Sequence, residues 1–175
     1  GVSKLAAEKH ILAGTVLYGY KAVCLRYFNV NGKNQRYDAY GNVIPIFANR
    51  IYTHQPITIY VDGDQTRDFI NVKDVALANI LAANSENTNY YNLGSGYSIT
   101  INDLADRMKR ISGIHAQILY APKRPGDVLH CKADITKIKQ GLGFQPSIEM
   151  EEGLSEYIEW YQTDLKNHQQ SNKIW

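Results

Sequence analysis

The sequence predicts an α/β protein in which helices alternate with strands along the chain. Segments with helical periodicity alternate with short runs that are rich in β-branched and aromatic residues, an order typical of βαβ units. The hydrophobic fraction of 44% and the charged fraction of 21% lie close to the averages of globular domains. With 175 residues, the chain is also long enough to bury one substantial core.

The expected helices have apolar residues spaced three and four positions apart, or a turn signal at one end. In the first of them, Leu5, Ile11 and Leu12 fall in helical register. Thr100 and Asp103 form a candidate N-terminal cap, and Gly143 is a plausible helix stop. We therefore expect helices at residues 4–14, 43–52, 74–83, 100–111, 134–142 and 150–165.

The expected strands are short apolar runs bounded by Gly, Asn and Asp, which favour turns. The clearest is KAVCLRYF, and the Asn- and Gly-rich stretch NVNGKNQ after it predicts a loop. We expect strands at residues 21–28, 57–61, 90–94 and 116–120. The GxGxxG turn that would open a dinucleotide-binding unit is absent, so periodicity alone predicts an α/β domain without locating its site.

Composition and spacing argue against several classes of protein. The net charge of +2 is too small to indicate a nucleic-acid surface. Cys24 and Cys131 lie far apart without a CxxC spacing, and the five histidines are scattered, so we expect no metal site and no disulfide framework. No apolar run approaches the roughly 18 residues of a membrane span. A reduced, cytoplasmic setting without membrane or nucleic-acid partners is the expectation.

Seven stretches occur in an order that resembles one family. They are SKLAAEK, RYFNVNG, VDGDQTRDFINVKDVA, YNLGSG, RPGDVLHCKAD, KIKQGLGFQP and EEGLSEYIEWY. Together they resemble the C-terminal half of the extended short-chain dehydrogenase/reductases that act on nucleotide sugars, with the UDP-glucose 4-epimerases as the nearest group. Each motif is weak alone, whereas seven in the same order are specific. The resemblance extends from Gly1 to about Tyr161.

The resemblance implies a fold and a domain organisation. Residues 1–175 would be the C-terminal part of a nucleotide-sugar epimerase, with the last strands of a Rossmann-type parallel sheet and a small α/β substrate-binding domain. The family signature is Tyr-x-x-x-Lys, and GVSK supplies its last four positions. The catalytic tyrosine would then stand immediately before Gly1. We accordingly expect the chain by itself to have no epimerase activity and no tight NAD affinity.

The resemblance also implies the cofactor, NAD, and the residues around it. Lys4 would hold the nicotinamide ribose, and its charge would favour the phenolate form of the neighbouring tyrosine. That tyrosine would take the proton of the sugar 4-hydroxyl. Phe28 would lie near the nicotinamide. Lys4 is therefore the expected catalytic residue, and Lys4 and Phe28 are the expected cofactor contacts.

Ten residues are expected to bind the UDP-sugar by the same resemblance. Guanidinium forks suit phosphate oxygens, so Arg67 and Arg124 would clamp the diphosphate. Asp127 would accept a hydrogen bond from a ribose hydroxyl. Cys131, a small residue, would face the substituent at C2 of the sugar and leave room for an N-acetyl group. The others are Asn29, at the sugar nucleotide, and the uridine-pocket residues Asn42, Val43, Thr58, Ile59 and Tyr60.

Other functions remain open at this point. A nucleotide-sugar 4,6-dehydratase or a UDP-glucuronate epimerase would use the same scaffold. The chain could also be a non-catalytic product that binds a sugar nucleotide or serves in dimerisation. The resemblance implies a homodimer for the intact protein, in which the helix that carries the Tyr-x-x-x-Lys signature packs, with a preceding helix, against the same pair in a second subunit. The apolar residues Leu5, Ile11 and Leu12 of this helix would then be partly uncovered in the present chain.

Overall fold

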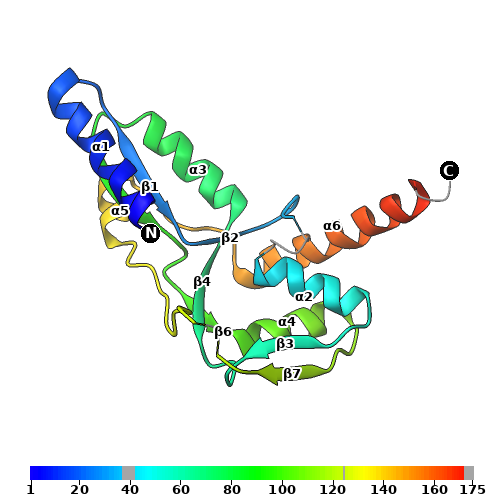
Figure 1. Ribbon diagram of the computed structural model, residues 1–175. Helices are drawn as coiled ribbons and strands as arrows, with labels where there is room; N and C mark the ends of the chain where they lie inside the picture. The colour runs from blue at the N-terminus through cyan, green and yellow to red at the C-terminus, as the bar shows by residue number, and fades with distance from the viewer. Residues whose placement is uncertain (37–41, 124, 172–175) are drawn as a thin grey trace.

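The α/β class predicted from the sequence is confirmed by a computed structural model, which describes residues 1–36, 42–123 and 125–171. Figure 1 shows two lobes joined by a central group of strands. The elements are α1 (Val2–Tyr18), β1 (Val23–Tyr27), β2 (Asn29–Asn31), α2 (Val43–Tyr52), β3 (Ile57–Tyr60), β4 (Thr66–Asn71), α3 (Val72–Ala83), β5 (Asn89–Leu93), β6 (Ser98–Thr100), α4 (Ile101–Ser112), β7 (Ile118–Ala121), α5 (Thr136–Leu142) and α6 (Met150–Ser171).

The strands pair across long stretches of sequence. In one lobe β1 runs parallel to β5, with Val23 opposite Asn89. In the other lobe β3 runs parallel to β7, with Ile57 opposite Ile118. Between them, β4 is paired on one side with the parallel strand β2 and on the other with the antiparallel strand β6. Parallel pairs need a crossover connection, and the helices supply it.

Two hydrophobic cores lie on either side of β4. The first is built by α2, α4, α6 and β3, and the second by β1, β5, α3 and α5. Phe69 belongs to the first core and the next residue, Ile70, to the second. Successive side chains of a strand point to opposite faces, so β4 contributes to both cores at once.

The structure corrects several predicted boundaries. Strands β4 and β6 were not predicted, and the expected loop NVNGKNQ begins with strand β2. Helix α1 continues past Gly14 to Tyr18, α3 begins at Val72, α5 begins at Thr136, and β7 spans Ile118–Ala121. The predicted helix cap and the predicted helix stop are both confirmed. Thr100 Oγ1 accepts a hydrogen bond from Asp103 N (3.0 Å), and Gly143 ends α5 in the left-handed conformation.

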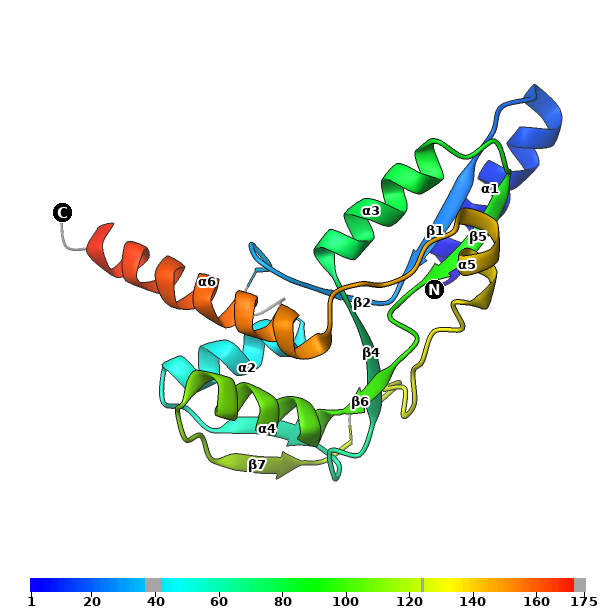
Figure 2. The same cartoon turned by 180° about the vertical axis from the view of Figure 1, so that it is seen from behind.

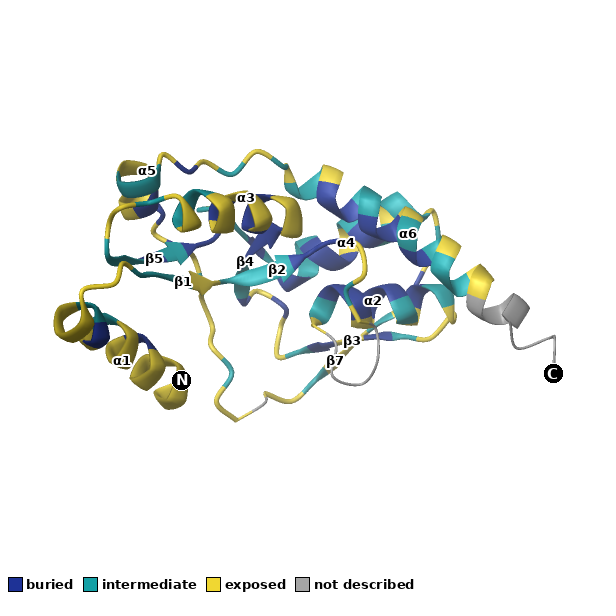
Figure 3. Ribbon diagram, turned by 90° about the horizontal axis from the view of Figure 1, so that it is seen from above, coloured by how far each residue is buried: buried dark blue, intermediate teal, exposed yellow. Residues whose placement is uncertain are grey.

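Helix α1 is attached to the molecule mainly through polar contacts. Figure 3 shows it largely exposed, on the opposite side of the β1–β5 sheet from α3 and α5. Its buried residues are Glu8 and Gly14. The Glu8 carboxylate accepts two hydrogen bonds from Arg26 of β1, from Nε at 2.6 Å and from Nη2 at 2.7 Å. Bidentate pairs of this kind hold both partners in a fixed orientation.

None of the helices in the described ranges has the length and the apolar character that crossing a lipid bilayer requires.

Candidate functional site

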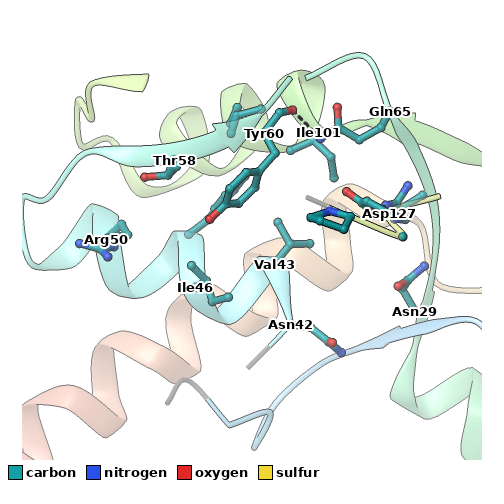
Figure 4. Close-up of a pocket in the computed structure, with 15 residues that line it drawn as sticks. Asn29, Asn42, Val43, Ile46, Arg50, Thr58, Tyr60, Gln65, Ile101 and Asp127 are labelled. Carbon is teal, nitrogen blue, oxygen red and sulfur yellow. Dashed lines mark hydrogen bonds and ion pairs between the residues drawn. The ribbon is translucent and has the colours of Figure 1, made fainter. Parts of the chain in front are cut away.

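A cavity of about 640 Å³ lies between α2, β3, β4 and the segment at residues 125–127. Figure 4 shows its lining residues pointing toward a common space from these separate elements. Eight of the residues predicted to bind the UDP-sugar line it: Asn29, Asn42, Val43, Thr58, Ile59, Tyr60, Arg67 and Asp127. Segments as distant as residues 29 and 127 therefore meet at one place.

Strand β3 and helix α2 form one wall of the cavity through their periodicity. In β3, Ile57 and Ile59 are buried in the first core, whereas Thr58 and Tyr60 are more exposed, as alternation along a strand requires. The Tyr60 ring crosses the space between β3 and α2 (Figure 4). In α2, the positions after Val43 at helical spacing are Ile46 and Arg50, and they line the same cavity.

Arg67 and Asp127 form the polar end of the cavity. Arg67 Nη2 lies 2.6 Å from Asp127 Oδ1, and Arg67 Nη1 donates to the Thr66 carbonyl oxygen at 2.8 Å. The side chains are 17% and 34% exposed, so water screens this pair less than it would a surface pair. The pair fixes the guanidinium at the cavity while N–H groups of the fork remain for an anionic ligand.

Asn29 and Gln65 also present polar groups beside the cavity. Asn29 Nδ2 donates to the Asp68 carbonyl oxygen at 2.9 Å, which holds the amide against β4. Gln65 Nε2 donates to the Tyr60 carbonyl oxygen at 3.0 Å, and this bond ties the turn after β3 to the strand. Gln65 is a lining residue that was not predicted.

Three predicted residues lie away from this cavity, and a fourth falls outside the described residues. Lys4 is an exposed residue of α1. Phe28 is half-buried against the second core, and its N–H donates to the Leu93 carbonyl oxygen at 2.9 Å. Cys131 is half-buried, and its N–H donates to Thr66 Oγ1 at 3.4 Å. The fourth, Arg124, lies outside the described residues.

Seven lining residues were not predicted, and two sequence signals could have found most of them. Helical periodicity from Val43 predicts that Ile46 and Arg50 share its face of α2. Residues inside or beside the quoted motifs account for several others. The unpredicted lining residues are Ile46, Phe47, Arg50, Gln65, Ile101, Pro125 and Gly126.

Within residues 1–36, 42–123 and 125–171, no group of three or more His, Cys, Asp or Glu side chains is placed to hold a metal ion. The cavity itself presents guanidinium, carboxylate, amide and aromatic groups. These groups suit a ligand that combines an anionic part with hydroxyl groups and a planar ring.

Comparison with known proteins identifies a family and several similar enzymes. Residues 1–94 match the family described as "NAD dependent epimerase/dehydratase family". A putative UDP-glucose 4-epimerase from Methanocaldococcus jannaschii is 37% identical over 160 residues, which cover 91% of this chain and 52% of that protein. A UDP-glucuronate 4-epimerase from Thermodesulfobacterium geofontis is 34% identical over 151 residues, which cover 86% and 46%. The chain thus spans about half the length of these curated relatives.

The fold matches a solved structure with the same coverage. The crystal structure of UDP-glucose 4-epimerase with UDP-glucose from Thermotoga maritima superposes with a TM-score of 0.91 at 34% sequence identity, over 94% of this chain and 53% of that one. The family match covers more than half of the chain, and it agrees with the resemblance drawn from the seven motifs. The chain belongs to the NAD dependent epimerase/dehydratase family.

Proposed function

We propose that the cavity binds the nucleotide of a UDP-sugar, and that the complete protein interconverts UDP-glucose and UDP-galactose through a 4-keto intermediate. One observation supports this most strongly. Eight residues that motif resemblance alone assigned to the sugar nucleotide surround a single cavity. They come from separate elements, so their convergence does not follow from closeness in sequence.

The cavity offers a plausible partner for each part of the nucleotide. Arg67 would bind the diphosphate through the N–H groups that Asp127 does not occupy. Asp127 would orient that guanidinium and accept a hydrogen bond from a ribose hydroxyl. The uracil ring would lie by Tyr60 and the backbone at Asn42 and Val43, where helix α2 begins with N–H groups that have no partner inside the helix.

The placement of Lys4 fits the NAD cofactor of the family. Figures 1 and 2 show the start of α1 at the end of the β1–β5 sheet where both parallel strands finish. Dinucleotides bind outside the carboxyl ends of such strands. When bound, NAD⁺ would accept the hydride from C4 of the sugar and return it. Lys4 would hold the cofactor ribose, and its charge would favour the phenolate of the tyrosine expected immediately before Gly1.

The identity of the sugar in the substrate is a separate part of the proposal. The similar UDP-glucuronate 4-epimerase makes UDP-glucuronate the competing substrate. Cys131 stays a predicted neighbour of the C2 substituent, where its small side chain would admit an N-acetyl group. A homodimer of the complete protein also belongs to the proposal. The exposed apolar residues Leu5, Val16 and Leu17 of α1 support a partner that packs against this helix.

The test is turnover by the complete protein, expressed with the sequence that precedes Gly1 and supplied with NAD⁺. We expect UDP-glucose to yield UDP-galactose, measured by anion-exchange chromatography, with UDP-glucuronate as the competing substrate in parallel. Arg67→Ala should weaken UDP binding by about 10- to 100-fold, or roughly 1.4–2.8 kcal/mol, because it removes the charged donor at the cavity.

Arg107→Ala is the matched control. Arg107 is also partly buried and ion-paired, with Asp103 at 3.0 Å and Glu151 at 3.3 Å, but it does not line this cavity. Its loss should leave the Kd for UDP unchanged. Turnover of UDP-glucuronate alone would shift the proposal to that substrate, and failure of the wild-type protein to bind UDP would overturn it.

A further inference from the structure

Asp68 is a fully buried carboxylate whose oxygens accept four hydrogen bonds. Oδ1 accepts from Ser95 N and Ser95 Oγ, both at 2.8 Å. Oδ2 accepts from Gly96 N at 3.0 Å and Ala133 N at 2.9 Å. The side chain has 0% exposure, so water cannot replace these donors. A carboxylate is stable in a protein interior only when its oxygens are hydrogen-bonded, and both oxygens of Asp68 accept two bonds each.

One of these donors, Ala133 N, belongs to a segment that returns from the cavity. After Asp127, the chain runs alongside β4, where Thr66 N donates to the Leu129 carbonyl oxygen at 2.9 Å. Cys131 N donates to Thr66 Oγ1 at 3.4 Å, and Ala133 N donates to Asp68. Residues 127–133, which we call the return segment, are therefore tied to β4 at successive points. The bond to Asp68 is the buried one of these.

The two adjacent charged residues of β4 point to opposite faces of the strand. Alternation along the strand directs Arg67 to the cavity and Asp68 away from it, into the molecule. Both contact the return segment, because Arg67 pairs with Asp127 at its start and Asp68 accepts from Ala133 at its end. Ala133 and Asp127 are thus two points, six residues apart, at which one segment is held to β4.

We propose that Asp68 is a positioning residue for the cavity: its carboxylate fixes the return segment so that Asp127 meets Arg67 in the geometry that binds the ligand. This inference rests on the proposed nucleotide-binding function. Asp68→Asn preserves shape but places an NH₂ group where one oxygen accepted hydrogen bonds from backbone N–H groups. Two of the four donors then face an NH₂ group, and the bonds that remain are made to a neutral oxygen and no longer to a carboxylate. In either orientation of the amide the hold on the return segment through Ala133 N is weakened.

Asp74 provides a matched control within the same motif. It is also buried, at 2% exposure, and its carboxylate accepts from Ser147 N (3.1 Å), Ser147 Oγ (2.8 Å) and Ile148 N (3.1 Å). It fastens the segment before α6, and neither it nor its donors line the cavity described above. Asp68 and Asp74 share residue type, burial and kind of donor, and differ in the segment that they hold.

The experiment compares Asp68→Asn and Asp74→Asn in the complete protein, with urea unfolding to measure the folded fraction and calorimetry to measure the Kd for UDP. Both variants should unfold at lower urea. Only Asp68→Asn should raise the Kd for UDP, by at least tenfold at matched folded fraction, and it should raise KM more than it lowers kcat. It should also reduce the coupling between Arg67→Ala and Asp127→Asn measured in a double-mutant cycle of UDP affinity.

Several results would contradict the positioning role of Asp68. An unchanged Kd in Asp68→Asn, or an equal rise in Asp74→Asn, would overturn the positioning role. If Asp68→Asn does not fold, Ser95→Ala removes one of the four bonds to Asp68, together with the bonds of Ser95 Oγ to Tyr97. It should raise the Kd in the same direction by a smaller factor, and no rise would contradict the proposal. If the wild-type protein does not bind UDP, the proposed function fails, and amide exchange of residues 129–133 in Asp68→Asn still tests the anchor: exchange unchanged there would refute it.

Discussion

Gly94 lies at the end of β5 against the cluster around Asp68, and its missing side chain is what allows the close approach. A Cβ added at this position would lie 2.5 Å from the Ala133 Cβ and 3.1 Å from both Asp68 carboxylate oxygens. Ala133 is itself buried at 3% exposure. A side chain at residue 94 would therefore push the return segment away from β4.

We expect Gly94→Ala to destabilise the protein by about 1–3 kcal/mol, the usual cost of overpacking a close-packed interior. Ala133→Gly in the same chain should restore part of that loss, because it removes the nearest clashing atom. Urea unfolding of the two single variants and the double variant measures the coupling between the positions. Strictly additive effects would show that the two side-chain positions do not compete for the same space.

At this scale, site residues could be predicted where their motifs resemble those of a known family. Arg67 and Asp127 were predicted in this way. Arg50 could have been found from helical spacing alone. The role of Asp68 could not be found this way, because its donors are Ser95, Gly96 and Ala133, and no local pattern places them beside β4.

Helix α1 shows how an element can be docked by an ion pair instead of an apolar face. Leu5 and Ile11 are 53% and 42% exposed, in agreement with the prediction that this face is partly uncovered. Glu8, by contrast, is buried and receives both hydrogen bonds from Arg26. The Arg26 guanidinium also lies over the Tyr90 ring, 4.3 Å from its centroid, which ties the helix to β5 as well as β1.

The pH dependence of this docking follows from the pKa of Glu8. The hydrogen bonds from Arg26 hold this pKa below its ordinary value of 4.5. The stabilisation is therefore fully present above about pH 4.5 and is lost as the pH falls through the lowered pKa of the folded state. The difference in urea midpoint between wild type and Glu8→Gln should be largest at neutral pH and should shrink in acid.

Glu159→Gln, at an exposed position of α6, is the control for this titration. This substitution also removes one carboxylate charge, but it leaves the pair between Glu8 and Arg26 intact. The urea midpoint of Glu159→Gln should therefore follow that of the wild-type protein at every pH. A Glu8→Gln difference that stays constant down to pH 3 would show that the carboxylate charge does not hold α1.

Strand β4 was not predicted because charged residues interrupt its apolar pattern. The sequence TRDFIN of β4 places two charged residues side by side, and such a pair is typical of a turn or a loop. In the structure each charge faces a different side and finds a distant partner, Arg67 with Asp127 and Asp68 with three backbone N–H groups. The strand is therefore stable although its local pattern is polar, whereas β3 was found because its apolar residues alternate in the usual way.

At the scale of the whole molecule, β4 couples the two lobes. Phe69 is 7% exposed in the first core, and Ile70 is 1% exposed in the second. Unfolding either core removes the support of one face of the same strand. The two lobes should therefore unfold as one cooperative unit, and the α/β class alone could not have predicted this coupling.

Ile70→Ala tests the coupling across the molecule. The truncation should cost about 2–5 kcal/mol, as for other fully buried aliphatic side chains. Trp160 packs against the first core, so its fluorescence, measured in a Trp175→Phe background, reports the lobe that Ile70 does not belong to. We expect the fluorescence and circular-dichroism transitions to shift together. Separate transitions, with the Trp160 signal unmoved, would show that the lobes unfold independently.

The long separations between paired strands have a consequence for biosynthesis. Because Ile57 pairs with Ile118, β3 leaves the ribosome long before its partner β7 does. Asp127 emerges later still, so the cavity cannot close until most of the chain has been made. During that interval the edge of β3 carries unpaired backbone groups of the kind that other chains can capture. Translation that stalls before residue 118 would thus leave a nascent chain that depends on chaperones to avoid aggregation.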